Sequence, residues 1–196
     1  HKPIALHAEK QSVAVAIGLA AIYDRPVHLC HISRQEEIEL IADAKMRGLK
    51  VTCEVCPHHL FLNREDGEKL GPYGNMRPVL GTPDDVAALW RHLNDTVDCI
   101  ATDHAPHTIA EKESSNPPGV PGVQTMLPLM LSAVRDGKLS LERLITMMAT
   151  NPRRIYGLAE PADTWVEVDT EATFTVRNEE QLSRCGWTPF DGWELT

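Results

Sequence analysis

The sequence lacks several features that would assign it to a specialised class of protein. Aromatic residues make up only 5% of its 196 residues. No apolar run approaches the roughly 20 residues that a membrane-spanning helix needs. The formal net charge is -9, and no basic stripe or RNA-binding signature offsets this acidity. These absences argue against a membrane protein and against a nucleic-acid-binding surface.

Cysteine is also sparse, and its spacing is not that of a disulfide framework. The five cysteines fit a reducing compartment better than a secreted protein, so we expect a cytoplasmic location. The sequence begins with His1 and shows neither an initiator methionine nor a signal peptide, which favours a fragment or a processed chain. With 42% hydrophobic and 24% charged residues, the composition is that of a globular chain with one sizeable core.

Short apolar strands alternate with amphipathic helices in the first half of the chain. We expect strands at 2–7, 25–31, 50–56 and 97–103, and helices at 11–23, 34–47 and 84–93. This alternation predicts βαβ units and therefore an α/β fold with a parallel sheet. Four such strands are half of an eight-stranded barrel.

Helix start signals and one long connection refine this assignment. Ser33 and Glu36 have the spacing of a capping box, and Gly48 lies where that helix should end. Thr82 and Pro83 fit the N-cap and first position of the helix at 84–93. The connection at 57–81 is longer than a simple loop requires, and such loops usually carry function.

The second half of the chain changes character near residue 161. Helices are expected at 123–136 and 140–149, and Asn151-Pro152 should open a short third helix. From about residue 161 the segments "TWVEVD" (164–169) and "ATFTV" (172–176) alternate like strands. We therefore divide the chain into an α/β part at 1–160 and a β-strand tail at 161–196.

Polar side chains with catalytic or metal-binding chemistry follow the expected strands where each one ends. In parallel sheets and barrels this carboxyl edge is where ligands bind. The residues are His7, Cys30, His31, Glu54 and Asp103.

Asp103 is the most informative of them, because a carboxylate at the end of an apolar strand must be paired, hydrogen-bonded or metal-bound. A helix cap or a core salt bridge would explain it alone. His7 and His31 lie at the ends of two other strands, and each alone would be read as structural. Together, two imidazoles and a carboxylate suit zinc or a similar divalent ion.

The cysteines carry weaker signals. Cys53 and Cys56 have C-x-x-C spacing, but residues three apart in a strand point to opposite faces, so we do not expect them to chelate one ion. Cys30 and Glu54 lie near strand ends, although both could be ordinary buried residues. Cys30 and its neighbour His31 can face one site only if the strand loses its regularity there.

Two cationic side chains lie in loops beside the expected site. Arg77 in "GNMRP" and His107 in "DHAPH" could hold a substrate carboxylate, whereas a loop arginine is more often only solvated. The segment "NPPGVPG" (116–122) is a rigid loop that could expose backbone groups to a ligand or simply make a turn. The remaining histidines are interpreted as structural: His28, His58, His59, His92 and His104.

Taken in order, the motifs resemble dihydroorotase, a member of the amidohydrolase superfamily. The matching segments are "ALHAE" (5–9), "HLCHIS" (28–33), "VTCEVCPHHLFL" (51–62), "MRPVLG" (76–81), "TDHAPHT" (102–108), "PPGVPGVQTMLPLML" (117–131) and "WTPFDG" (187–192). The likeness is greatest to the dihydroorotase domain of the multifunctional pyrimidine-biosynthesis protein of animals and to bacterial relatives. It implies the C-terminal half of a TIM-like (β/α)8 metal-dependent hydrolase barrel, followed by the β-containing tail.

The resemblance also implies roles for individual residues. His7 and His31 match two histidine ligands of zinc. Asp103 matches an aspartate that both binds zinc and acts as general acid and base. Cys30 and Glu54 match residues that help to hold an additional zinc in the animal-type enzyme. The cofactor implied is zinc, binuclear in the intact enzyme and with a possible third ion.

The substrate residues follow in the same way. Arg77 and His107 match residues that hold the substrate carboxylate, and Pro118 matches a loop position that contacts substrate. The reaction implied is the reversible cyclisation of N-carbamoyl-L-aspartate to L-dihydroorotate in pyrimidine biosynthesis. The implied macromolecular partners are a second copy of the chain or aspartate transcarbamoylase.

The resemblance begins part of the way into the family pattern. The His-x-His pair, the carboxylated lysine, and an arginine and an asparagine for substrate belong before the first residue of this sequence. We therefore expect this sequence to be the C-terminal part of a dihydroorotase and to be inactive as an isolated chain. The alternatives are another cyclic amidase, such as a hydantoinase or allantoinase, and a non-catalytic dihydroorotase-like scaffold for aspartate transcarbamoylase.

Overall fold

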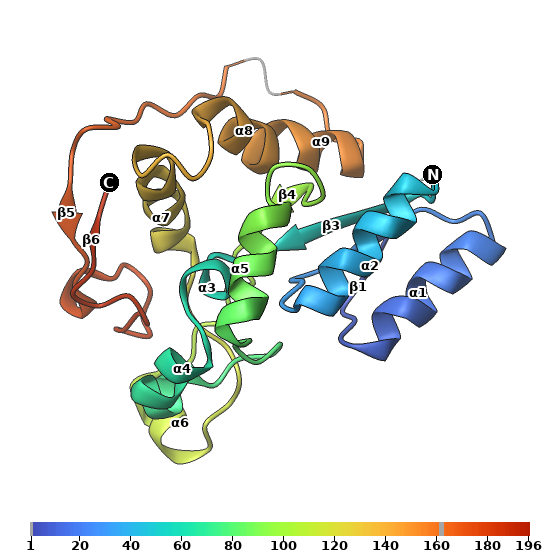
Figure 1. The fold of residues 1–196 in the computed structure, drawn as a ribbon. Coiled ribbons are helices and arrows are strands. Elements are labelled where there is room, and N and C mark those ends of the chain that lie inside the picture. The colour runs from blue at the N-terminus through green and yellow to red at the C-terminus, as the bar shows by residue number, and fades with distance from the viewer. Residues whose placement is uncertain (1, 161–162) are drawn as a thin grey trace.

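A four-stranded parallel sheet organises the first hundred residues of the chain (Figure 1). The computed structural model describes residues 2–160 and 163–196. Neighbouring strands follow one another in sequence order, as the βαβ pattern predicted. The strands are β1 (Ile4–Leu6), β2 (Val27–Leu29), β3 (Val51–Val55) and β4 (Cys99–Ile100).

Three helices connect these strands and pack in a row. Helix α1 (Gln11–Ile22) follows β1, α2 (Gln35–Met46) follows β2, and α5 (Pro83–His92) precedes β4. Helix α2 contacts both α1 and α5 (Figure 1). The expected helices at 11–23, 34–47 and 84–93 are thus confirmed, with ends that differ by at most one residue.

The connection between β3 and α5 is not a long loop, so that prediction is wrong. It forms α3 (Pro57–Phe61), α4 (Arg64–Leu70) and a 3-10 turn (Gly71–Gly74). Asn63 supplies the start signal for α4, because its Oδ1 accepts hydrogen bonds from the backbone N–H groups of Glu65 and Asp66.

Strand β1 is more exposed than the expected buried strand. Ile4 is 43% exposed, whereas Leu29, the last residue of β2, is fully buried. The cause is position: β1 pairs only with β2 and forms an edge of the sheet, while β2 and β3 have neighbours on both sides. An apolar pattern alone does not distinguish an edge strand from an interior one.

The second half of the chain is largely helical and packs against β4 and α5. It contains α6 (Ile109–Ser114), α7 (Val123–Arg135), α8 (Leu141–Ile145), a π-helical turn (Thr146–Thr150) and α9 (Asn151–Tyr156). Arg143 connects α8 to the end of α5, because its Nη2 donates a hydrogen bond to the Leu93 carbonyl over 2.9 Å. No helix of the described residues is long and apolar enough to cross a membrane.

The tail forms less β-structure than its alternating pattern indicated. Only β5 (Phe174–Thr175) and β6 (Glu194–Leu195) pair, in antiparallel register. The expected strand at 164–169 is wrong: Trp165 and Val166 are each 76% exposed and the described residues give that segment no strand partner. The expected boundary at residue 161 lies outside the described residues.

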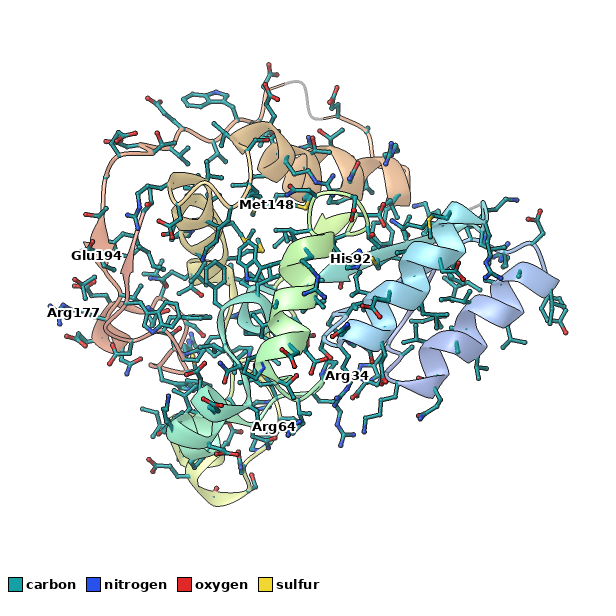
Figure 2. All side chains as sticks on the ribbon, viewed as in Figure 1. Arg34, Arg64, His92, Met148, Arg177 and Glu194 are labelled. Atoms are coloured by element: carbon teal, nitrogen blue, oxygen red, sulfur yellow. The ribbon has the colours of Figure 1, made fainter. Side chains whose placement is uncertain are left out.

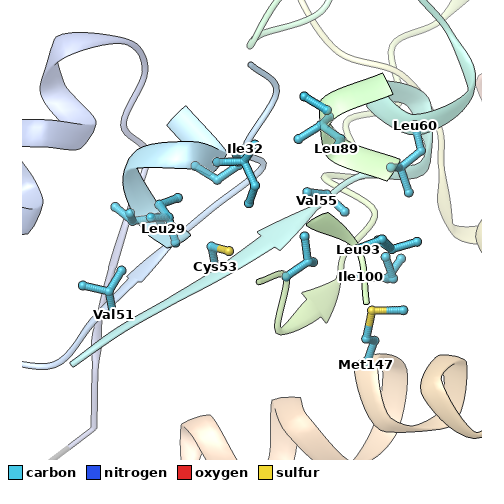
Figure 3. Packing of buried hydrophobic residues seen from close by; sticks show 14 of the residues in the cluster. Leu29, Ile32, Val51, Cys53, Val55, Leu60, Leu89, Leu93, Ile100 and Met147 are labelled. Carbon is cyan, nitrogen blue, oxygen red and sulfur yellow. The ribbon is translucent and has the colours of Figure 1, made fainter. Parts of the chain in front are cut away.

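Two hydrophobic clusters hold these layers together. The larger one lies between the sheet and its helices, where Leu29, Cys53, Val55 and Leu89 meet with Met147 from the helical half (Figure 3). The second joins the tail to the loops and α7 through, among others, Val120, Leu129, Trp187, Phe190 and Leu195. The tail therefore contributes to the core.

The start of α2 differs from the expected capping box by one residue. Glu37, which is 2% exposed, accepts hydrogen bonds at Oε2 from the backbone N–H groups of Ser33 and Arg34. Its Oε1 accepts from the Lys10 N–H over 2.7 Å, which ties α2 to the start of α1. Glu36 is exposed, and Arg34 marks the start of the helix in Figure 2. The Ser33–Glu36 assignment is therefore wrong.

This correction yields a direct test of stability. We expect Glu37→Ala to lower the free energy of unfolding by about 1–3 kcal/mol, because three backbone donors lose their acceptor. Glu36→Ala, the matched control in the same turn, should change it by less than about 0.5 kcal/mol. Urea denaturation of both variants measures the difference, and equal effects would contradict the assignment.

Candidate metal and substrate site

The residues expected at strand ends do gather at one edge of the sheet. His7 directly follows β1, and Cys30 and His31 directly follow β2. Glu54 is the residue before the last in β3. Asp103 lies three residues beyond β4. Because all four strands are parallel and adjacent, these positions share the carboxyl edge.

The two histidines of this edge are in contact. The ring centroids of His7 and His31 are 4.4 Å apart in an edge-to-face arrangement. Asp103 is close enough to His31 for its charge to oppose the drop in the pKa of His31. The His7 Nε2–H donates to Glu9 over 3.1 Å, and the ligand atoms of His7, His31 and Asp103 do not all lie within 4.8 Å of one another.

An unusual backbone conformation turns two of these residues out of their strands. His31 has φ 41° and Asp103 has φ 45°, both in the left-handed region that non-glycine residues rarely adopt. Such conformations cost about 1–3 kcal/mol each and cluster at functional sites. The loss of strand regularity that Cys30 and His31 need in order to face one site therefore occurs at His31.

His31 has the chemical state that a metal ligand requires. The residue is buried, and its Nδ1 has no hydrogen-bond partner. Burial lowers the pKa of His31, with the nearby His7 acting in the same direction and Asp103 opposing it. The ring is therefore neutral at physiological pH, and a neutral imidazole nitrogen without a partner can bind a divalent cation.

Glu54 is held between two side chains. Its Oε2 lies 2.9 Å from Nε2 of the buried His28, whose Nδ1 lies 2.8 Å from Thr52 Oγ1. On the other side, burial and the Glu54 carboxylate raise the pKa of Cys30 to about 11. His28, interpreted from the sequence as structural, thus orients an acidic residue of the site.

The loops that carry the expected substrate residues lie next to one another. His107 Nε2 is 3.2 Å from the Pro118 carbonyl oxygen. Gly119 has φ 136°, and a Cβ there would lie 2.6 Å from the Cβ of Ala105, so only glycine allows these loops to approach. Arg77 is exposed on the preceding loop. The structure thus brings His107 next to Pro118, while Arg77 is exposed to solvent.

A second group of donors was missed by the sequence interpretation. Cys56, His58 and His59 are buried at the start of α3, with one potential ligand atom from each within 4.8 Å of the others. His59 Nε2 is 3.0 Å from the Pro78 carbonyl, and its Nδ1 has no partner. Their C-x-H-H spacing was the available signal. Cys53 is not part of this group, which agrees with the expectation that Cys53 and Cys56 do not bind one ion together.

Comparison with known proteins gives the site a context. No protein-family profile matches the chain. It is 51% identical over 194 residues to the multifunctional protein CAD of Squalus acanthias, covering 98% of this chain and 9% of that protein. It is 37% identical to the dihydroorotase of Methanosarcina acetivorans, covering 94% of this chain and 44% of that enzyme. The chain spans about half the length of the curated dihydroorotases that it matches.

Solved structures of related proteins superpose on most of this chain. The L-hydantoinase of Arthrobacter aurescens superposes with a TM-score of 0.87 at 28% identity, over 95% of this chain and 45% of that one. The inactive dihydroorotase-like domain of a CAD-like protein of Chaetomium thermophilum superposes with a TM-score of 0.83 at 32% identity, over 100% and 54%. The fold is thus that of about half a cyclic-amidohydrolase barrel. Within that class, the chain is a dihydroorotase-related amidohydrolase.

The buried histidines predict how stability depends on pH. Burial lowers the pKa of His59 to about 4, from 6.5. Between these values the unfolded chain binds a proton that the folded chain does not. Stability is therefore complete above about pH 6.5 and falls toward pH 4, by up to roughly 1.4 kcal/mol per pH unit for this one group.

We expect His59→Gln to flatten this acid dependence, because glutamine does not titrate and its amide can still donate to Pro78. Urea denaturation at several pH values between 4.5 and 7 measures the slope of the unfolding free energy. His92→Gln, which removes a histidine outside this group, is the control. A slope for His59→Gln equal to that of the wild type would contradict the assignment.

Proposed function

We propose that the chain forms the C-terminal part of a dihydroorotase, which interconverts N-carbamoyl-L-aspartate and L-dihydroorotate in pyrimidine biosynthesis. The observation that carries this proposal is the shared sheet edge, where His7, His31 and Asp103 follow parallel strands and the rings of His7 and His31 are in contact. The identity to a dihydroorotase over nearly the whole chain supports it.

His7, His31 and Asp103 are the residues that would hold zinc, and Cys30 with Glu54 would contribute to a further ion. The donor set fits, because His31 is a neutral, buried imidazole whose Nδ1 has no partner. A bound zinc ion supplies Lewis-acid polarisation of a carbonyl and lowers the pKa of water.

Asp103 is suited to move the proton in this reaction. In the hydrolytic direction its carboxylate takes a proton from the attacking water and delivers it to the ring nitrogen as the amide bond breaks. Cyclisation reverses both transfers, so the residue returns to its starting state in either direction. Its exposure and its left-handed backbone place the carboxylate beyond the strand, where a substrate can reach it.

Arg77 and His107 would hold the substrate carboxylate, and the loop at Pro118 would contact the substrate beside them. The arginine offers a planar pair of donors that matches a carboxylate, and His107 is fixed by its contact with the Pro118 carbonyl. These groups orient the substrate and do not take part in bond-making.

Two other functions have specific support. The hydantoinase likeness favours a cyclic amidase without carboxylate recognition. The likeness to an inactive dihydroorotase-like domain favours a scaffold within a multifunctional protein, where aspartate transcarbamoylase or a second copy would be the partner. We rank both below dihydroorotase, because a scaffold does not need His7, His31 and Asp103, and a hydantoinase does not need Arg77 with His107.

The central test is Asp103→Asn in the protein that the complete gene encodes. We expect kcat for dihydroorotate to fall by about 10²–10⁴-fold, while circular dichroism and thermal unfolding stay close to wild type. Asp95→Asn, at the opposite edge of the sheet, is the matched control and should keep full activity. Wild-type protein without dihydroorotase activity and without stoichiometric zinc, measured by mass spectrometry, would favour the scaffold.

Substrate choice provides a second test. We expect the same wild-type protein to open dihydroorotate in preference to hydantoin and allantoin, because only dihydroorotate carries the ring carboxylate. Arg77→Ala should raise KM for dihydroorotate by about tenfold or more, the loss expected for a charge-assisted pair. Equal rates on all three rings would identify a different cyclic amidase, and an unchanged KM in the variant would remove Arg77 from carboxylate binding.

A further inference from the structure

Lys112 in α6 is a lysine with no exposed surface. Its Nζ donates to three main-chain carbonyl oxygens: those of Asn75 at 2.9 Å, Pro117 at 2.9 Å and Gly119 at 3.3 Å. An ammonium group has three donors, so these bonds use all of them. Burial lowers the pKa of the Lys112 ammonium, which is the cost of placing a charge in this interior.

The three acceptors come from the two loops of the expected substrate pocket. Asn75 lies two residues before Arg77, and Pro117 and Gly119 lie on either side of Pro118. The loops also bond to each other directly, since the Gly119 N–H donates to the Asn75 carbonyl over 3.0 Å. Lys112 thus bridges the loop at 75–77, here called the arginine loop, and the loop at 117–119, here called the proline loop.

The C-terminal tail joins the same assembly through Trp187. Its ring lies under the Lys112 ammonium, 5.6 Å from Nζ to the ring centroid. Its Nε1–H donates to the His107 carbonyl over 2.7 Å. Tyr73, two residues before the arginine loop, packs against the same ring at 4.9 Å. Lys112 and Trp187 together contact the loops of Arg77, His107 and Pro118.

A purely structural role does not account for this arrangement. A methionine would fill the volume of the Lys112 side chain without the cost of a buried charge. The ammonium instead connects the backbones of two loops, and all its acceptors lie within two residues of a proposed substrate contact.

We propose that Lys112 and Trp187 are positioning residues for substrate carboxylate recognition, which they set by fixing the three loops relative to one another. This inference rests on the proposed dihydroorotase function. Neither residue touches the substrate; each acts through the loop backbones. The tail residues around Trp187 are accordingly part of the substrate-binding apparatus.

Kinetics of the protein encoded by the complete gene test this inference. We expect Lys112→Met and Trp187→Phe to raise KM for dihydroorotate by about tenfold and to change kcat by less than about threefold, because ground-state and transition-state binding weaken together. Trp187→Phe keeps an aromatic ring, removes the N–H and part of the ring volume, and leaves Lys112 in place, so it remains informative if Lys112→Met does not fold. Lys112→Arg should restore part of the lost affinity.

Matched controls separate positioning from general stability. Lys45 is a half-buried lysine that donates to the Thr96 carbonyl and to Asp98 at the opposite edge of the sheet. Lys45→Met should lower stability and leave KM unchanged. Trp165 is 76% exposed on the tail, so Trp165→Phe should change neither.

Hydrogen exchange supplies a readout that does not depend on catalysis. Amides of 104–107 and 116–120 should exchange faster in Trp187→Phe than in wild type, while α2 is unaffected. An active wild type with unchanged KM in Lys112→Met and Trp187→Phe would overturn the positioning role. A wild type inactive on dihydroorotate would instead refute the proposed function, and in that case unchanged loop exchange would also overturn the role of Lys112 and Trp187.

Discussion

Parallel pairing of the four strands in chain order is the constraint on which the rest of this structure depends. Each strand must enter the sheet from the same side, so each leaves it at the same edge. Polar residues separated by up to about a hundred positions are thereby brought together without any direct attraction between them. His7, Cys30, His31, Glu54 and Asp103 share an edge for this reason, and the buried apolar interior of β2 and β3 holds the register.

The local backbone then determines what those side chains can do. Left-handed conformations at His31 and Asp103 turn the chain away from the strand direction, while burial keeps the imidazole of His31 neutral. Glu54 is fixed by His28 on one side and influences Cys30 on the other. The edge thus combines the buried, neutral imidazole of His31 with the solvent-accessible carboxylate of Asp103, which suits both metal binding and proton transfer.

The loops above this edge depend on a different kind of interaction. Their backbones bond to one another at a few points, such as the Gly119 N–H to the Asn75 carbonyl, and the Lys112 ammonium adds three further hydrogen bonds to their carbonyl groups. Because Trp187 comes from the tail, the end of the chain and the middle of the chain meet at these loops. The inactive dihydroorotase-like domain with the same fold illustrates that the barrel does not guarantee catalysis, so function depends on the individual residues at the edge and in these loops.

The sequence by itself determined the parallel α/β architecture and the order of its strands and helices, because hydrophobic periodicity and local start signals are properties of neighbouring residues; the strands are shorter than expected at both ends. It could not determine which glutamate caps α2, because Glu37 also accepts a hydrogen bond from the backbone N–H of Lys10, at the start of α1. Nor could it predict that 164–169 would lack a strand partner. Only the tertiary structure decided that Cys56 meets His58 and His59, and that Lys112 joins two loops, because these contacts form between groups whose distances exist only after the chain has packed.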